Sequence, residues 1–416
     1  MANVGEWTGS EVLALRQSLR MSQAKFAAKL GAHIRTVKAW EAGGGIANVY
    51  QAALDTTLSR ASDEIVGAFW ARLRPDQEDD VDRRQMLSTA DIGFAAIGLG
   101  GDAARGEWLL SGAGRPDAWA LECVRTTLHA AMLLDDALGS PAAHGMVLAQ
   151  QHLTEAMLRE SPADLRQPML ALHAEWLGFA GALAWDQLDY RTAARLYNLA
   201  RDYAHEAEDS DGAGYMLCHL SQLAIWEGKP RIAVDHAVAA RSWVAQSNDR
   251  ALRAYVAMRA AEAYATAGQR RGCHDALEDA ARDMDGLPTG LTPAESRAYF
   301  VSDPFLESYR GQCFSLLGDG VQAVTSSRRA IAAIEPTRTR DKAITMLELE
   351  RALIQVGDID EAAASVVQAV DLTERNRSPR LATAITDGRR ALSPWAASQA
   401  VRELDARLSA RDIVIV

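Results

Sequence analysis

Five short turns recur along the C-terminal part of the chain, and this repeat restricts the fold more than any other feature. The spacings between successive turns are 40, 40, 50 and 39 residues. A small residue stands five and again twelve positions after each turn. Turns framed by small residues in this way predict antiparallel helical hairpins whose two helices approach closely. The turns are Leu188-Asp189, Gly228-Lys229, Gly268-Gln269, Gly318-Asp319 and Gly357-Asp358.

Small residues occupy three fixed offsets from these turns. Seven positions before each turn, four of the five residues are small, and Glu350 is the exception. Because the pattern recurs in every copy, we expect each of these positions to face the partner helix of its hairpin. The full set is Gly181, Ser221, Ala261, Gly311 and Glu350, then Ala193, Ala233, Cys273, Ala323 and Ala362, then Ala200, Ala240, Ala280, Ala330 and Ala369.

The repeat resembles the tetratricopeptide repeat over about Arg166–Glu374, most plainly in the sequence GDIDEA of Gly357–Ala362. A spacing near 40 residues exceeds the usual ~34 of that family, which predicts longer helices or connectors. Helices at about Asp117–Gly139 and Ala142–Glu160 are expected to precede the array. Residues Leu381–Ser409 are expected to close it. The resemblance implies an α-solenoid with a concave surface suited to peptides or partner helices.

The one long spacing places extra residues in the sequence GLPTGLTPAESRAYFVSDPF, residues 286–305. This segment predicts a loop that shapes a pocket or an interface. Tryptophans on the repeat helices are candidates for ligand contact, although such residues are more often part of the core between repeats. They are Trp176, Trp185, Trp226 and Trp243.

The N-terminal residues carry signals for three short helices in succession. Thr8 and Glu11 have the spacing of a capping box, and Ser22 is placed to cap a second helix. Gly31 can adopt the left-handed conformation that ends the second helix. A third helix is expected from about Ile34 to Ala42. Two short helices joined by a glycine turn predict a helix-turn-helix.

The sequence SQAKFAAKLGAHIRTVKAWEAG, Ser22–Gly43, resembles the lambda-repressor-like (Xre-type) helix-turn-helix family. The resemblance covers about Ser10–Leu58. It implies that Arg16 and Glu41 form an internal ion pair. It also implies that one residue meets DNA phosphate and that five others face the groove. These are Gln23 for the phosphate, and His33, Ile34, Arg35, Lys38 and Ala39 for the groove.

The groove-facing residues differ in what they can contribute. Arg35 is the best base reader because its guanidinium can grip guanine O6 and N7, whereas Lys38 suits phosphate. Ile34 can contact a thymine methyl group. His33 stands where the family has Ser or Thr as the cap, and imidazole is a poor cap. Ala39 is too short for polar readout.

Charge is distributed unevenly along the chain. The 416 residues have a formal charge of −11, yet residues 1–60 hold seven Lys or Arg against four Asp or Glu. A basic N-terminal unit can meet phosphate while the acidic remainder is repelled by it. An ordinary solvated helix surface would also explain these charges, so charge alone does not identify a DNA-binding protein.

Several other functions find little support in the sequence. The four cysteines form no CxxC pair, and no run of apolar residues is long enough for a membrane span. Both observations favour the cytoplasm. No metal, nucleotide or hydrolase motif is present, and neither Cys218-His219 nor Cys273-His274 can form a dyad, because adjacent helical residues point about 100° apart. We therefore expect no enzyme activity, metal or cofactor. The segments 82–101 and 98–106 only mimic an export signal and a dinucleotide loop.

The sequence thus predicts an all-α protein with an N-terminal helix-turn-helix and a tetratricopeptide-like α-solenoid. The expected domains are a DNA-binding domain at 1–73, a connector at 74–115 and a repeat domain at 116–416. The predicted function is sequence-specific transcriptional regulation by a homodimer on double-stranded operator DNA, with a peptide or small-molecule effector on the repeats. The alternative is a protein–protein adaptor or sensor with a vestigial helix-turn-helix.

Overall fold

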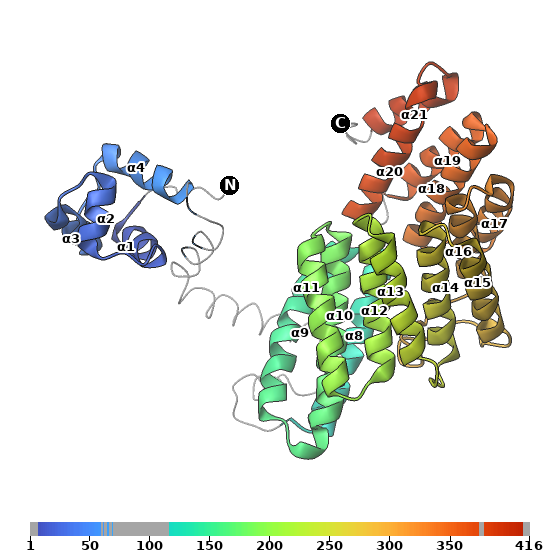
Figure 1. Ribbon diagram of the computed structural model, residues 1–416, viewed down its shortest axis with the longest axis horizontal. Coiled ribbons are helices and arrows are strands. Elements are labelled where there is room, and N and C mark those ends of the chain that lie inside the picture. Colours follow the sequence, from blue (N-terminus) through green and yellow to red (C-terminus); the bar gives the residue numbers. More distant parts are fainter. Residues whose placement is uncertain are drawn as a thin grey trace. The chain divides into compact units, whose positions relative to one another are not determined.

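The computed structural model describes residues 7–59, 61, 65, 69, 116–373 and 378–410, and all regular secondary structure within them is helical (Figure 1). This confirms the all-α prediction. The chain divides into two compact units, Met1–Ser88 and Thr89–Val416. The predicted connector at 74–115, with its two misleading motifs, lies outside the described residues. Within the described parts, no helix has the length and apolar character that a bilayer crossing requires.

In residues 7–59 the N-terminal unit, called the head below, forms four short helices. The second and third helices join through Gly31, which has φ of 65° and lies in the left-handed region. Ser22 caps the second helix by accepting a hydrogen bond from Lys25 N at 3.3 Å, and Thr8 N donates to Glu11 Oε2 at 2.8 Å. The helices are α1 (Gly9–Ser18), α2 (Gln23–Leu30), α3 (Ile34–Glu41) and α4 (Asn48–Ser59).

A single apolar core holds the head together. Its members come from every helix and from Trp7 ahead of α1. Trp7 is fixed to α4 because its indole Nε1 donates to Asp55 Oδ1 at 2.8 Å and its backbone N donates to Gln51 Oε1 at 2.9 Å. Val37 and Trp40 of α3 are buried in this core, so the opposite face of α3 is turned outward.

In the C-terminal unit, called the body below, the first two helices of the described residues match the two expected ahead of the repeats. Five helical hairpins and two further α-helices follow within the described residues. The helices are α8 (Ala118–Leu138), α9 (Ser140–Glu160), α10 (Ala163–Asp186), α11 (Tyr190–Glu206), α12 (Ser210–Trp226), α13 (Pro230–Trp243), α14 (Arg250–Thr266), α15 (Arg270–Met284), α16 (Asp303–Leu316), α17 (Gly320–Ala333), α18 (Thr339–Val356), α19 (Ile359–Leu372), α20 (Pro379–Ala391), the 3₁₀ turn η1 (Ser393–Trp395) and α21 (Gln399–Ser409).

The five predicted turns join the two helices of each hairpin. Their first residues all have positive φ, between 67° at Leu188 and 83° at Gly357, which is why glycine occupies four of the five places. The alanines and the cysteine five and twelve positions later are all 0% exposed. They lie against the partner helix, and the predicted close packing of the hairpins is confirmed.

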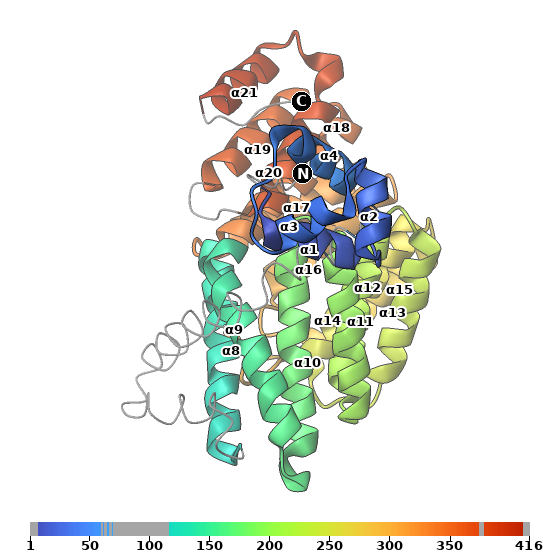
Figure 2. The ribbon, with the colours of Figure 1, turned by 90° about the vertical axis from the view of Figure 1, so that its left-hand side faces the viewer.

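Hairpins that follow one another in the sequence lie side by side (Figures 1 and 2). The first helix of each hairpin contacts the first helix of the next, from α10 through α12, α14, α16 and α18 to α20. The row curls until α20 contacts α10 as well. Residues near both ends of the body therefore meet each other.

A group of buried and half-buried polar side chains joins the two ends. Arg340 of α18 donates to Asp135 Oδ2 of α8 at 3.0 Å. The hydroxyl of Ser378 donates to Asp186 Oδ1 of α10 at 2.6 Å, and the guanidinium of Arg380 lies 4.0 Å from the ring centroid of Trp185. We call this group the closing cluster: Asp135, Asp136, Asp186, Arg340, Ser378 and Arg380.

The small residues before the turns give a direct test of hairpin packing. A Cβ atom on Gly181 would lie 2.7 Å from Cε1 of Tyr197, whose ring is 1% exposed. We expect Gly181→Ala to lower the free energy of unfolding by about 1–3 kcal/mol, the usual cost of overpacking. The measurement is urea unfolding followed by circular dichroism.

Gly145→Ala in α9 is the matched control, because no heavy atom lies within 4 Å of the added Cβ. Since alanine favours helix over glycine, it should raise stability by about 0.5–1 kcal/mol. Equal effects of the two substitutions would contradict close packing at Gly181.

Candidate functional site

The outward face of α3 carries most of the residues that the sequence predicts to meet DNA. The side chains of His33, Arg35, Lys38 and Ala39 are exposed, and Ile34 is half-buried against the head core. Arg35 and Lys38 are three positions apart and therefore share one side of the helix. One short helix therefore presents the guanidinium of Arg35, the ammonium of Lys38 and the apolar side chain of Ile34.

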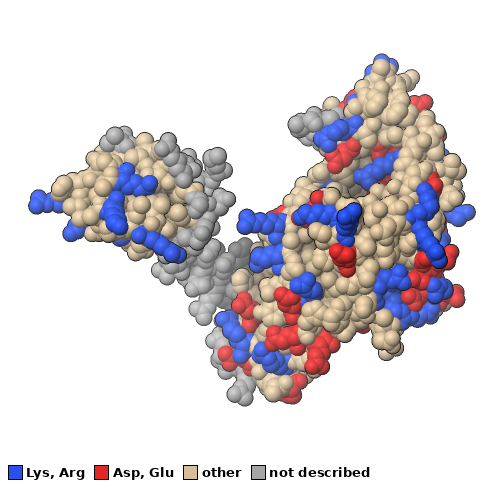
Figure 3. Space-filling model, in the orientation of Figure 1, with Lys and Arg blue, Asp and Glu red and all other residues tan. Residues whose placement is uncertain are grey.

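The acidic side chains of residues 7–59 are engaged within the head itself. Residues 7–59 contain three acids, and each has an internal partner: Glu11 accepts from Thr8, Glu41 pairs with Arg16, and Asp55 accepts from Trp7. The cations differ. In the part of the chain that the structure describes, no ion pair forms at Arg20, Lys25, Lys29, Arg35 or Lys38. Lys and Arg side chains accordingly spread over the face of the head drawn in Figure 3.

The predicted internal ion pair is present. Arg16 Nε donates to Glu41 Oε1 at 2.6 Å, and its Nη1 donates to the carbonyl oxygen of Met21 at 2.9 Å. Gln23 joins the same carboxylate, because its Nε2 donates to Glu41 Oε2 at 2.6 Å. The amide of Gln23, half-buried, is thus directed to the structural pair in the free protein. A phosphate contact from this side chain requires its remaining N–H.

His33 caps α3 after all. Its Nδ1 accepts a hydrogen bond from Arg35 N at 3.2 Å, and its backbone is extended with φ of −81°. An imidazole, which the sequence analysis expected to be a poor cap, thus accepts an N-terminal hydrogen bond of this helix. The ring can accept at Nδ1 only in the neutral form that carries its proton on Nε2. The first turn of α3, which holds Arg35, begins at a defined place.

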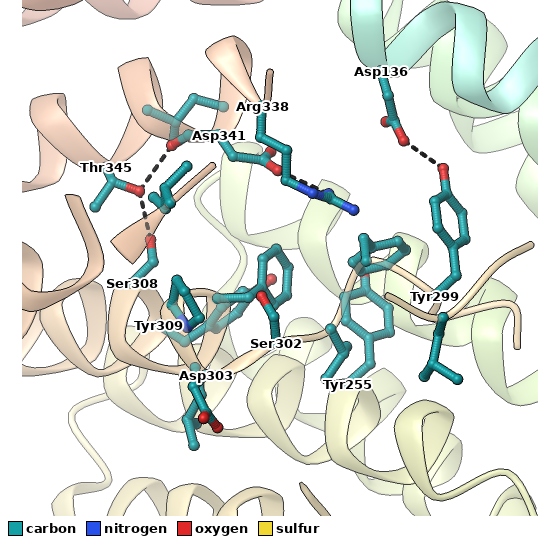
Figure 4. A pocket seen from close by; sticks show the side chains of 18 of the residues that line it. Asp136, Tyr255, Tyr299, Ser302, Asp303, Ser308, Tyr309, Arg338, Asp341 and Thr345 are labelled. Atoms are coloured by element: carbon teal, nitrogen blue, oxygen red, sulfur yellow. Dashed lines mark hydrogen bonds and ion pairs between the residues drawn. The ribbon is translucent and has the colours of Figure 1, made fainter. Parts of the chain in front are cut away.

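A pocket of about 920 Å³ lies within the body, at the centre of the curled row of helices. Its walls come from α8, α10, α12, α14, α16, α18 and the segment between α15 and α16. That segment is the predicted loop, and residues 285–291, Arg297 and residues 299–302 line the pocket. Figure 4 shows Tyr299 of this segment bonded to Asp136 of α8, a contact of 2.5 Å between the hydroxyl and Oδ2.

Aromatic rings form much of one pocket wall. Tyr255 of α14 meets the ring of Phe300 edge-on, with centroids 5.2 Å apart, and Phe300 meets Phe305 at 5.3 Å. Phe305 in turn lies 5.1 Å from Tyr309. Burial raises the pKa of the Tyr255 hydroxyl to about 12. Burial and, less strongly, Arg259 lower the pKa of His219 on the neighbouring wall to about 3, so this ring is neutral at physiological pH.

Arg259 is the most deeply placed cation of the pocket lining. Its side chain is 2% exposed, and its Nη1 donates to Glu262 Oε2 and to the hydroxyl of Tyr309, both at 2.6 Å. Its Nε and Nη2 have no hydrogen-bond partner in the structure. Rings flank it, since the guanidinium lies 5.8 Å from the centroids of both Tyr255 and Tyr309.

The four candidate tryptophans divide between core and surface. Trp176 is fully buried, Trp185 and Trp226 line the pocket, and Trp243 is 43% exposed beside His205. The Cys-His pairs are packing residues: Cys218 and Cys273 are both 0% exposed. Among the described residues, no group of three or more His, Cys, Asp or Glu side chains is placed to hold a metal.

The sequence pointed to part of the pocket lining, namely the segment 286–305 and the candidates Trp185 and Trp226, but not to the aromatic wall as a whole or to Arg259. The dense aromatics of 299–305 are a visible signal, and so is Arg259, a charge three residues before Glu262 in an otherwise Ala-rich helix. Nothing in the sequence pairs Arg380 with Asp186, because 194 positions separate them.

Comparison with known proteins adds little. No protein-family model matches the chain, and no curated protein matches it. Among the solved structures that match is the crystal structure of BtubC (BKLC) from P. vanneervenii, with 17% sequence identity over 55% of this chain and 91% of that chain. The TM-score is 0.38. A likeness at this level defines neither the fold nor the function of the chain.

Proposed function

We propose that this chain is a sequence-specific DNA-binding transcriptional regulator. In this proposal α2 and α3 are a helix-turn-helix of the lambda-repressor-like (Xre-type) kind, and α3 enters the major groove. The body is a tetratricopeptide-like solenoid that dimerises and binds an effector. Two heads would then read half-sites about 34 Å apart. Binding of the effector would favour one placement of the heads and so change the affinity for the operator.

One observation carries the proposal. Within residues 7–59 all three acids have internal partners, and among the described residues no ion pair forms at five cations, two of them on the exposed face of α3. A surface of this kind attracts the phosphate backbone over a long range. The capped start of α3 places Arg35 in the first turn, the part of a recognition helix that contacts base edges.

The test begins with the purified full chain and a pool of random double-stranded DNA, from which bound fragments are selected. We expect the double variant Arg35→Ala with Lys38→Ala to bind the selected sequence about 100-fold more weakly, because it loses one base contact and one phosphate contact. We also expect its affinity to depend less steeply on salt concentration. Fluorescence anisotropy at several salt concentrations measures both.

A double variant of the body, Arg231→Ala with Arg271→Ala, is the matched control because it removes the same charge from exposed positions. It should bind the selected DNA like the unchanged protein. Failure to select any sequence, or equal loss in both double variants, would refute the proposal. The alternative function, a protein–protein adaptor with a vestigial helix-turn-helix, would then be favoured. The hydrogen bond from Gln23 to Glu41 supports that alternative, because it engages the side chain expected to meet phosphate.

A further inference from the structure

The pocket of the body has the size and lining of a small-molecule site. Its volume of about 920 Å³ lies in the range of pockets that enclose a drug-sized ligand. Figure 4 shows how its lining residues come from distant parts of the chain, with Arg338 and Asp341 of the α18 region, Tyr309 of α16 and Tyr255 of α14 around a common space. A site assembled in this way encloses a compact ligand.

The aromatic rings of the pocket wall determine the shape and polarity of the larger part of that ligand. Tyr255, Phe300, Phe305 and Tyr309 contact one another as neighbours, at centroid separations of 5.1–5.3 Å for successive pairs. Phe300 and Phe305 are only half-buried, so part of each ring remains open. Open aromatic surface favours a flat apolar partner, which it can stack on or meet edge-on.

Arg259 selects the polar group of the ligand. The guanidinium of Arg259 is 2% exposed, and its Nε and Nη2 have no hydrogen-bond partner and almost no accessible surface. An acceptor therefore reaches these two N–H donors only when the flanking rings of Tyr255 and Tyr309 move aside. An unmade hydrogen bond of a buried charged group is costly, so an acceptor that reaches these donors gains binding free energy. Glu262 already balances the charge, which lets either a neutral carbonyl or a carboxylate serve as the acceptor.

The carboxylates of the pocket lining would bind a cationic ligand only weakly, because most of them already have partners. Asp136 is bonded to Tyr299, Glu348 to Arg351, and Glu262 to Arg259. Asp135 has one unpartnered oxygen, but its other oxygen accepts from Arg340, whose charge would repel a second cation. Asp341 is paired with Arg338. The remaining acids of the lining, Asp285, Asp303 and Glu335, are exposed and therefore hydrated.

We infer that the pocket binds a small molecule that has a flat apolar ring system and a carbonyl or carboxylate acceptor directed at Arg259 Nε and Nη2. If the chain is the proposed regulator, this molecule is its effector, and only that role rests on the proposed function. Binding itself requires no DNA.

Three probes with one aromatic body and different polar groups test the inference: 2-naphthoate, 2-naphthamide and 2-naphthylmethylammonium. Each is titrated into the full chain without DNA and followed by ligand-observed saturation-transfer NMR. We expect the naphthoate, the naphthamide or both to bind with a Kd of about 1 mM or tighter, as suits probes of their size. The ammonium probe should bind at least about tenfold more weakly.

Two variants locate the binding. Arg259→Met should weaken binding of the acceptor probes about tenfold or more. Since this change leaves Glu262 buried without its cation, Phe305→Ala provides a second test that spares the pair, and we expect a similar loss from the missing ring. Trp243→Ala, an exposed position outside the pocket, is the control and should change nothing.

The inference is overturned if no probe binds, if the ammonium probe binds as well as the others, or if both pocket variants leave binding unchanged. Capture of extended peptides in place of every small probe would also overturn it. A failed DNA selection leaves these measurements intact, so the two proposals can fail separately.

Discussion

Replacement of Asp186 by alanine is expected to lower the free energy of unfolding of the body by about 3–5 kcal/mol, the usual loss when one partner is removed from a buried charged network. Asp186 is 3% exposed and accepts from Ser140 at 2.7 Å, from Ser378 at 2.6 Å and from Arg380 at 3.4 Å. The alanine variant leaves two hydroxyls and a guanidinium without this acceptor.

Urea unfolding followed by circular dichroism measures the loss of stability. Hydrogen exchange of the α20 amides shows whether the contact between α20 and α10 has opened. Asp164→Ala in the first turn of the same helix removes an exposed carboxylate and should cost less than about 1 kcal/mol. Asp186→Asn keeps one acceptor oxygen and should fall between the two. A loss below about 1 kcal/mol for Asp186→Ala would show that the closing cluster does not hold the ends together.

Glu350→Gln is expected to stabilise the body at neutral and alkaline pH, by about 3 kcal/mol at pH 7 and about 5 kcal/mol at pH 9. Glu350 is 0% exposed, and neither carboxylate oxygen has a hydrogen-bond partner in the structure. Burial is the main cause that raises its pKa to about 8, against an ordinary value of 4.5. The unfolded chain releases this proton from about pH 4.5 upward, whereas the folded body holds it up to about pH 8.

The sign of the pH dependence follows from these two values. Stability supplied by the protonated form is complete below pH 4.5 and is lost progressively as the pH rises to about 8. The unchanged protein and Glu350→Gln should therefore unfold at similar urea concentrations near pH 4.5 and diverge above it. Glu278→Gln, an exposed position on α15, is the control and should show no divergence. Parallel curves for Glu350→Gln and the unchanged protein would mean that Glu350 ionises normally.

The hairpins of the body could be predicted because their signals are local. A left-handed turn demands glycine or tolerates little else, and a close helix pair demands small residues, so both leave marks at fixed offsets. Even the exception was visible, since Glu350 stands where the other copies have Gly, Ser or Ala. What the sequence could not reveal is that this carboxylate has no partner.

The sites were less predictable because they depend on contacts between distant residues. The outward face of α3 follows from the burial of Val37 and Trp40 in the core of the head. In contrast, the bond from Gln23 to Glu41 and the cap at His33 depend on side-chain rotamers that no motif specifies. The pocket requires the whole curl of the body, and therefore Arg259 carried no sign of its surroundings.

Joining the two ends of the body changes how such a chain can come apart. A linear row of hairpins loses its terminal members first, because each contacts only its neighbours and an outer one can fray alone. Here Arg340 holds α8 across 205 positions of sequence, and Ser378 holds α10 across 192. Closing so long a loop costs only slightly more entropy than closing one half its length. The body thus has no outermost hairpin to lose, and its amides should exchange in a single cooperative opening.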